Sequence, residues 1–279
     1  MTRRNPLVSL YLSAPGSRFW AAASGLNLED AMARAAALGY DAVELMPRDV
    51  QDPPPEVLRD AAERCGLQVL GLATGFIALE RGLTLTHPDG DVRRQAVCAV
   101  QACLRFAQRA GARFVSLGLV RGKLSPGVRQ PQAREHLVAS VRECGMTAGE
   151  LGLLLLVEPG NRYETDFIHT VEEGVEFLQE VDLPSVRLLA DTFHMNMEEA
   201  SLPKALSRAG AHLAHLHLAD SNRRAPGWGH LDFPAVAVAL QQIGYDGALG
   251  VEILLEPDFE AAARQAVEFV RRLFGSAQR

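Results

Sequence analysis

The chain has 279 residues, is 48% hydrophobic and carries a formal net charge of −6. This length fits one large α/β domain or two ordinary ones, and the acidic balance argues against a nucleic-acid-binding protein, which would present a basic face. The cysteines show no metal-binding or redox spacing and no apolar stretch reaches the length of a membrane span, so we expect a cytoplasmic protein that binds neither nucleic acid nor a membrane.

Eight short apolar runs recur along the chain, and each is followed by a turn signal and a helix-like stretch. They are Leu7–Leu12, Tyr40–Met46, Leu67–Ala73, Arg113–Leu119, Leu151–Glu158, Val186–Asp191, Leu213–Ala219 and Ala248–Leu254. Several helix-like stretches end in glycine, and the helix-ending glycines are Gly39, Gly66, Gly111, Gly152 and Gly244. Glycine there supplies the left-handed residue that stops a helix and leads into the next strand.

Strict alternation of strand and helix predicts a parallel sheet. Eight such units in about 250 residues are typical of a (β/α)8 barrel. A doubly wound open sheet is the alternative, but the residues after the first run, "SAPGS" at 13–17, are not its glycine-rich phosphate fingerprint. The sequence therefore predicts one TIM-barrel domain over residues 1–279, with its active site at the C-terminal ends of the strands.

Four successive predicted strands, the fifth to the eighth, end in side chains that can bind a metal. Glu158 closes the fifth run, Asp191 the sixth, His217 lies near the end of the seventh, and Glu252 near the end of the eighth. At one barrel mouth, three carboxylates beside one imidazole would repel one another strongly without a cation. An oxygen-rich set with one imidazole suits Mn, Mg or Co better than a structural Zn. We therefore predict a divalent metal site, which explains why a buried strand runs into Glu158.

Other polar residues near the strand ends have simpler interpretations. His215 lies two residues before His217, faces the same way one layer deeper, and is predicted to be a hydrogen-bonded core residue. Glu44 ends the second run and could line the mouth, but nothing in the sequence pairs it with a partner. Trp228 either covers the site or packs its own loop.

Four segments together resemble a known family. They are "VEPGNRYET" (157–165), "DTFHMNMEE" (191–199), "HLHLADSNRRAPGWGHLDF" (215–233) and "GYDGALGVEI" (244–253). They are similar to the D-tagatose/D-psicose 3-epimerases, within the xylose isomerase-like TIM barrels. The likeness runs from Gly39 to Glu256 and includes "HPDGDVRRQAV" at 87–97.

The resemblance implies a function and a set of site residues. The metal ligands would be Glu158, Asp191, His217 and Glu252, and the two glutamates would also be the catalytic acid–base pair. Substrate oxygens near the carbonyl would be held by Glu164, His194 and Arg223. The implied reaction is C3 epimerisation of a ketose through an enediolate. One divalent ion per chain, Mn before Mg, Co or Zn, and a homodimer or homotetramer are implied as well.

Other functions could use the same residues. An aldose–ketose or hydroxypyruvate-type isomerase passes through the same enediolate, and an inositol-type dehydratase would use a similar metal site. An endonuclease of this superfamily needs several Zn ions with His ligands after strands three and four, where this chain has "LAT" (72–74) and "LGL" (117–119). A non-catalytic sugar-binding barrel is disfavoured because both glutamates are present.

The loops that would select the substrate match the family least. The first strand and its loop, "LYLSAPGSRFW" at 10–20, match only loosely, and the loop after strand four carries Arg121 and Lys123 where free-sugar epimerases tend to place an aromatic residue. Arginine binds anionic groups through paired hydrogen bonds. We therefore hypothesise that Arg121 and Lys123 select a sugar with a remote phosphate or carboxylate, and the identity of the sugar stays open.

Overall fold

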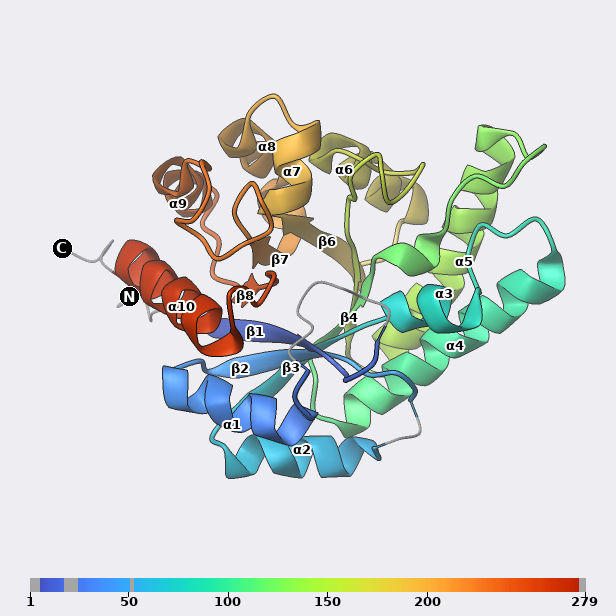
Figure 1. Cartoon of the computed structure of the whole chain (residues 1–279). Helices are drawn as coiled ribbons and strands as arrows, with labels where there is room; N and C mark the ends of the chain where they lie inside the picture. Colours follow the sequence, from blue (N-terminus) through green and yellow to red (C-terminus); the bar gives the residue numbers. More distant parts are fainter. Residues whose placement is uncertain (1–5, 18–24, 51–52, 276–279) are drawn as a thin grey trace.

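Eight parallel strands close into a barrel in the computed structural model, which describes residues 6–17, 25–50 and 53–275 (Figure 1). In order around the barrel the strands are β1 Val8–Ser13, β2 Ala42–Met46, β3 Gln68–Ala73, β4 Phe114–Leu117, β5 Leu154–Val157, β6 Val186–Asp191, β7 Leu213–Leu218 and β8 Leu249–Val251. Pairing of β1 with β8, from Val8 beside Leu249 to Leu10 beside Val251, closes the ring. The predicted (β/α)8 TIM barrel is confirmed, and the open-sheet alternative is wrong.

Helices surround the barrel and connect successive strands (Figure 1). They are α1 Leu28–Leu38, α2 Pro55–Arg64, α3 Gly75–Arg81, α4 Gly90–Arg109, α5 Gln130–Glu150, α6 Val171–Val181, α7 Thr192–Glu198, α8 Leu202–Ala209, α9 Phe233–Gln242 and α10 Phe259–Gly275, with 3-10 turns η1 Leu119–Arg121 and η2 Gly210–His212. The short elements α3, η1 and α7 directly follow β3, β4 and β6, so they form part of the C-terminal rim. None of the helices in these described ranges is both long and apolar enough to cross a lipid bilayer.

The strands are shorter than the apolar runs that predicted them. Of the run Leu151–Glu158 only Leu154–Val157 is strand, because Gly152 has φ +70° and completes the end of α5. At the other end of the same run, Glu158 already lies beyond the strand. The same shortening makes β8 three residues long, so Glu252 also stands outside the ladder with its side chain at the barrel mouth.

A small apolar cluster lies among the inward-facing strand residues, apart from the main core. It consists of Ala42, Leu70, Phe114, Leu156 and Leu189, which come from five successive strands. Their neighbours in sequence, such as Val43 and Val115, belong to the main core with the helices, as the alternation of side chains along a strand requires. The ring of Phe114 packs against His215 with centroids 4.8 Å apart, so the apolar cluster meets the polar layer at that point.

Candidate metal centre and active site

The four predicted metal ligands converge at the C-terminal mouth of the barrel. One ligand atom from each of Glu158, Asp191, His217 and Glu252 lies within 4.8 Å of the others. Glu158 and Glu252 directly follow β5 and β8, Asp191 ends β6, and His217 is the second-to-last residue of β7. Parallel strands in a closed barrel bring their carboxyl ends to one face, which explains why residues spread over 95 positions in the sequence meet here.

Three buried atoms at this place lack hydrogen-bond partners among the described residues. One is Nε of Arg223, and the other two are Nδ1 of His217 and Oε1 of Glu158. They face each other at 3.6 Å, and Nδ1 also lies 2.7 Å from Oε2 of Glu252 in an ion pair. Buried polar atoms are rarely left without partners. A divalent cation between them would satisfy both atoms, because imidazole nitrogen and carboxylate oxygens are ligands that such ions accept. The residues therefore fit a divalent metal ion.

Arg223 neutralises two of these carboxylates. Its Nη1 donates to Oδ2 of Asp191 at 2.8 Å, and its Nη2 donates to Oε1 of Glu252 at 2.6 Å. All three residues are buried. The guanidinium also lies over the ring of Phe193, 4.6 Å from its centroid. Arg223, predicted to hold substrate oxygens, thus lies in the pocket and also binds the carboxylates of two candidate metal ligands.

The loop after β7 holds Arg223 in an unusual backbone conformation. Arg223 has φ +62°, which few residues other than glycine adopt. The buried carboxylate of Asp220 organises this loop by accepting the backbone N–H groups of Ser221, Gly227 and Leu231 at 2.8–3.1 Å. The backbone N–H of Arg223 donates to the carbonyl of Asp220. The loop therefore fixes the guanidinium over the carboxylates.

The charges in this cluster shift its pKa values in different directions. Burial raises the pKa of Asp191 despite the opposing effect of Arg223. Burial would also raise the pKa of Glu252, but Arg223 and His217 outweigh it and lower that pKa to about 2. For His217, burial acts to lower the pKa, while Glu44 and Glu252 raise it well above its usual value. Without a metal, the cluster is held together by an imidazolium and a guanidinium among carboxylates.

Asn161 links two of the predicted substrate-binding residues. Its Oδ1 accepts the backbone N–H of Tyr163 at 3.0 Å, so its Nδ2 faces Oε1 of Glu164 and Nδ1 of His194, each at 2.8 Å. Because Nδ1 of His194 then accepts, the neutral ring carries its proton on Nε2, which lies 4.0 Å from Oδ2 of Asp191. No role for Asn161 was predicted from the sequence. The spacing of three residues between Asn161 and Glu164 was the feature of the sequence that could have indicated their hydrogen bond.

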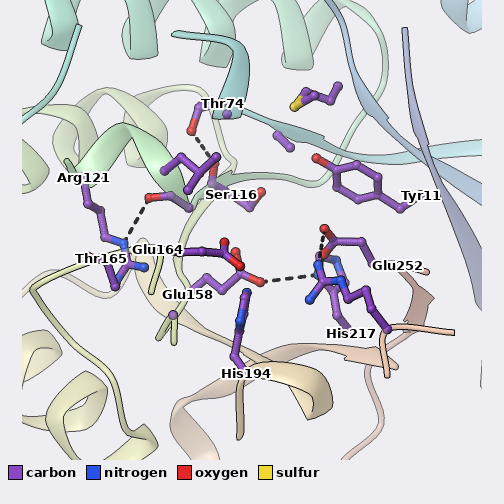
Figure 2. Close-up of a pocket in the computed structure, with 17 residues that line it drawn as sticks. Tyr11, Thr74, Ser116, Arg121, Glu158, Glu164, Thr165, His194, His217 and Glu252 are labelled. Carbon is purple, nitrogen blue, oxygen red and sulfur yellow. Dashed lines mark hydrogen bonds and ion pairs between the residues drawn. The ribbon is translucent and has the colours of Figure 1, made fainter. Parts of the chain in front are cut away.

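A pocket opens beside the four candidate ligands and encloses about 550 Å³ of space, part of which is open solvent. Figure 2 shows Glu158, His194, His217 and Glu252 around it. All the predicted catalytic and substrate-binding residues line it, with Tyr11, Met46, Ala73, Thr74, Gly75, Ser116, Gly118, Leu119, Arg121, Gly160 and Thr165. A Cβ atom on Gly118 would lie 3.1 Å from Oε2 of Glu158, so glycine leaves room for that carboxylate. Trp228 is not among the described lining residues, which favours its loop-packing role.

The two cations of the loop after β4 differ in position. Arg121 is buried, lines the pocket and donates to the backbone carbonyls of Gly118 and Phe167 at 3.1 and 3.2 Å. Burial lowers the pKa of Arg121 to about 10, so it is still charged at neutral pH. The ammonium of Lys123 instead donates to the carbonyl of Tyr163 at 2.8 Å, and Lys123 is absent from the described pocket lining. The hypothesis of an anion-selecting pair therefore retains only Arg121.

Glu44 does have partners, although the sequence suggested none. Its carboxylate is buried and bound by His215 and His217, whose Nε2 atoms lie 2.9 and 2.8 Å from it. Burial acts to raise the pKa of Glu44, but the two imidazoles hold it well below its usual range. The prediction that His215 is a hydrogen-bonded core residue is confirmed. The partners of Glu44 are more than 170 positions away and lie across the barrel.

Comparison with known proteins identifies the family of this chain. The chain matches the model of the family described as xylose isomerase-like TIM barrel over residues 32–273. A D-psicose 3-epimerase from Enterocloster bolteae is 32% identical over 275 residues, covering 88% of this chain and 89% of its own length. An L-ribulose 3-epimerase from Methylomonas sp. is 30% identical, covering 84% of this chain and 79% of its own length.

A solved structure agrees with these matches. The crystal structure of a D-allulose 3-epimerase from Methylomonas sp. in complex with D-allulose is 26% identical and superposes with a TM-score of 0.81, covering 96% of this chain and 98% of that one. The family match spans most of this chain, and the first of the two epimerases above is matched over most of its own length. This chain therefore belongs to the xylose isomerase-like TIM barrel family, where the relatives it resembles are ketose 3-epimerases, enzymes of the isomerase class.

Proposed function

We propose that this protein is a metal-dependent isomerase that epimerises a ketose at C3. One observation carries the proposal: Glu158 and Glu252, from strands that are not neighbours, meet at one candidate metal site that opens into a pocket. A proton next to a carbonyl is weakly acidic, so its removal needs both a base and a means of stabilising the resulting negative charge. This site offers residues for both tasks.

In the proposed reaction the two glutamates work on opposite faces of the substrate. One takes the proton from C3, and the other delivers a proton to the other face of the enediolate, which inverts the centre. A divalent ion held by Glu158, Asp191, His217 and Glu252 would supply positive charge beside two adjacent substrate oxygens. Glu158 has a carboxylate oxygen without a hydrogen-bond partner, whereas Oε1 of Glu252 accepts from Arg223 and Oε2 lies 2.7 Å from Nδ1 of His217.

Three further residues would hold the substrate near its carbonyl. Nε2–H of His194 is a fixed donor, because its Nδ1 is occupied by Asn161. Glu164 accepts from Asn161 through one oxygen and can accept a sugar hydroxyl through the other. Arg223 provides positive charge close to the oxygen on which negative charge develops. These roles extend to this chain what the family resemblance implies.

The relatives give the first substrates to test, D-psicose and L-ribulose. Arg121 is a buried cation that lines the pocket, as Arg223 is, so a sugar with an anionic group is a second kind of substrate to test. An aldose–ketose isomerase is the second candidate, because the same two carboxylates could move a proton between C1 and C2. The metal is proposed to be Mn, since an oxygen-rich set with one imidazole suits it.

The deciding experiment is a product analysis with the Mn(II)-loaded protein. D-psicose, L-ribulose and their phosphorylated or acidic counterparts are each incubated with enzyme, and the products are separated and identified. The C3 epimer is the expected product, and chelation should abolish its formation while metal analysis shows about one ion per chain. An aldose product would favour the isomerase, a dehydrated product the dehydratase, and several ions per chain would contradict the proposed site.

We also propose that the protein is cytoplasmic and that it forms a homodimer or homotetramer. All four cysteines, Cys65, Cys98, Cys103 and Cys144, are free, as expected in the reducing cytoplasm. A homodimer or homotetramer is expected by family resemblance. Light scattering of the purified protein measures this directly, and a monomer would contradict the expectation.

A further inference from the structure

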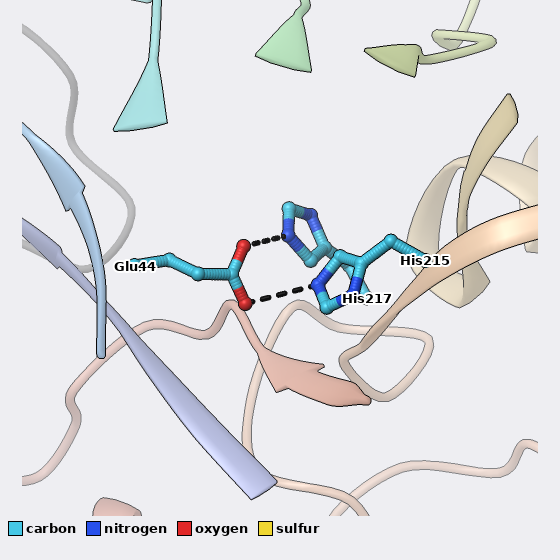
Figure 3. Close-up of side chains that lie close together, drawn as sticks. All are labelled: Glu44, His215 and His217. Atoms are coloured by element: carbon cyan, nitrogen blue, oxygen red, sulfur yellow. Dashed lines mark hydrogen bonds and ion pairs between the residues drawn. The ribbon is translucent and has the colours of Figure 1, made fainter. Parts of the chain in front are cut away.

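Glu44 forms a buried polar cluster directly behind the metal site. Figure 3 shows its carboxylate between His215 and His217. Oε1 accepts the hydroxyl of Ser9 at 2.5 Å and Nε2–H of His215 at 2.9 Å, and Oε2 accepts Nε2–H of His217 at 2.8 Å. The carboxylate is 2% exposed and comes from β2, whereas both imidazoles come from β7. The contact therefore crosses the interior of the barrel.

The contact with Glu44 determines which nitrogen of the His217 ring carries a proton. An ionised carboxylate only accepts hydrogen bonds, so Nε2 of His217 must carry a proton. In the neutral ring Nδ1 then has a free lone pair, and Nδ1 is the atom that lies 2.7 Å from Glu252 and 3.6 Å from Glu158. Edge contacts with Tyr11 and His215, whose ring centroids lie 5.8 and 5.0 Å away, hold the ring plane.

We propose that Glu44 is a positioning residue for the metal centre, holding His217 in the orientation and tautomer that present Nδ1 to the ion. This inference rests on the metal site of the proposed function. Carboxylates that accept the second N–H of a ligating histidine orient the ring and strengthen it as a ligand. His215 lies at the other carboxylate oxygen, so the bond from His217 to Glu44 does not depend on it.

Glu44, His215 and His217 could be read instead as a second metal site, but the geometry favours hydrogen bonding. Both carboxylate oxygens already lie 2.8–2.9 Å from an imidazole nitrogen, which is a hydrogen-bond distance. A tetrahedral metal ion about 2.0–2.2 Å from each atom would hold the nitrogen and the oxygen about 3.3–3.6 Å apart. The number of ions bound per chain distinguishes the two readings.

Strand β8 is adapted to this cluster. A Cβ atom on Gly250 would overlap Oε1 of Glu44 and lie 2.7 Å from both Nε2 of His215 and Cδ2 of His217. Only glycine leaves space there for the carboxylate to reach both rings. Gly250 stands two residues before Glu252, so the strand that delivers one metal ligand also makes room for the group that orients another.

The test compares Glu44→Gln with His215→Asn. Glutamine keeps the shape of glutamate but offers one accepting oxygen and one NH2 group, so it cannot accept from both rings. Binding of Mn(II) to the metal-free proteins is measured by calorimetric titration. Glu44→Gln should weaken affinity about 10–100-fold. His215→Asn disturbs the same cluster but leaves the Glu44–His217 bond, so its affinity should stay near the wild-type value.

Each other outcome overturns the inference in a distinguishable way. Equal affinity of Glu44→Gln and wild type, or an equal loss in both variants, removes the positioning role while the metal site stands. Two ions per wild-type chain would establish the second metal site instead. No uptake by wild type would refute the proposed metal site itself. If Glu44→Gln fails to fold, long-range 1H–15N NMR of Mg(II)-loaded wild type decides, since a proton on Nδ1 of His217 would contradict the proposal.

Discussion

The substitution Arg223→Gln tests whether the buried carboxylates at the barrel mouth need a positive charge beside them, supplied either by Arg223 or by a metal ion. In the metal-free protein the substitution leaves Asp191 and Glu252, 1% and 4% exposed, without the cation that binds them at 2.8 and 2.6 Å. Removing one partner of a buried ion pair costs about 3–5 kcal/mol. At about 2 °C per kcal/mol for a chain of this size, Tm should fall by about 6–10 °C.

The neighbouring residue provides a matched control. Arg224 pairs with Glu256 at 3.0 Å, but both side chains are about half exposed, so Arg224→Gln should cost ~1 kcal/mol or less. Calorimetric melts are recorded with EDTA and with excess Mn(II). Because a bound divalent ion supplies positive charge to the same carboxylates, Mn(II) should raise the Tm of Arg223→Gln more than that of wild type. Equal melting of the two variants in EDTA would refute the reasoning.

Three further predictions follow from the same geometry. Glu158→Gln and Glu252→Gln should each lower kcat by at least about 10²–10⁴-fold, because each removes a proton-transfer group. Near-normal turnover of either metal-loaded variant would exclude the two-glutamate mechanism. Asn161→Ala removes the amide that donates to Glu164 and to Nδ1 of His194. We expect kcat/KM to fall about tenfold to a hundredfold while metal affinity is unchanged. An unchanged kcat/KM would show that Asn161 does not position these two residues. The folded-state pKa of Glu252 is lowered to about 2, so its contribution to the stability of the metal-free protein is present above its ordinary pKa of 4.5 and is lost as pH falls from there towards 2. Urea unfolding at a series of pH values should show this loss in wild type and a weaker one in Glu252→Gln, and equal slopes would contradict the assigned shift.

The barrel and the meeting of four strand-end residues at its mouth could be predicted because both depend on local sequence. Alternation of apolar runs with glycine-ended helices indicates a parallel sheet, and the glycines expected to end helices, Gly39, Gly66, Gly111, Gly152 and Gly244, all have positive φ. A residue that follows a strand in a barrel must lie at the mouth. Position along the chain was therefore sufficient to bring Glu158, Asp191, His217 and Glu252 together.

Contacts across the barrel could not be predicted in this way. The pairing of Glu44 with His215 and His217 depends on how two strands that are not neighbours face each other in the interior, and no local spacing records that. The sequence also gives no side-chain rotamer. Arg223 was thus expected to meet only substrate, although its guanidinium reaches two carboxylates. For the same reason Lys123, placed correctly in a rim loop, was expected in the pocket although it binds the carbonyl of Tyr163.

The most direct test of the central claim is the position at which solvent hydrogen enters the substrate. The Mn(II)-loaded protein is incubated with D-psicose in D2O, and deuterium in substrate and product is located by NMR. Proton transfer by Glu158 and Glu252 at C3 predicts deuterium on C3 of the newly formed epimer, and Glu158→Gln and Glu252→Gln should each suppress it. Deuterium at C1 or C2 without exchange at C3, or epimer formed without any deuterium, would contradict a two-glutamate C3 epimerase.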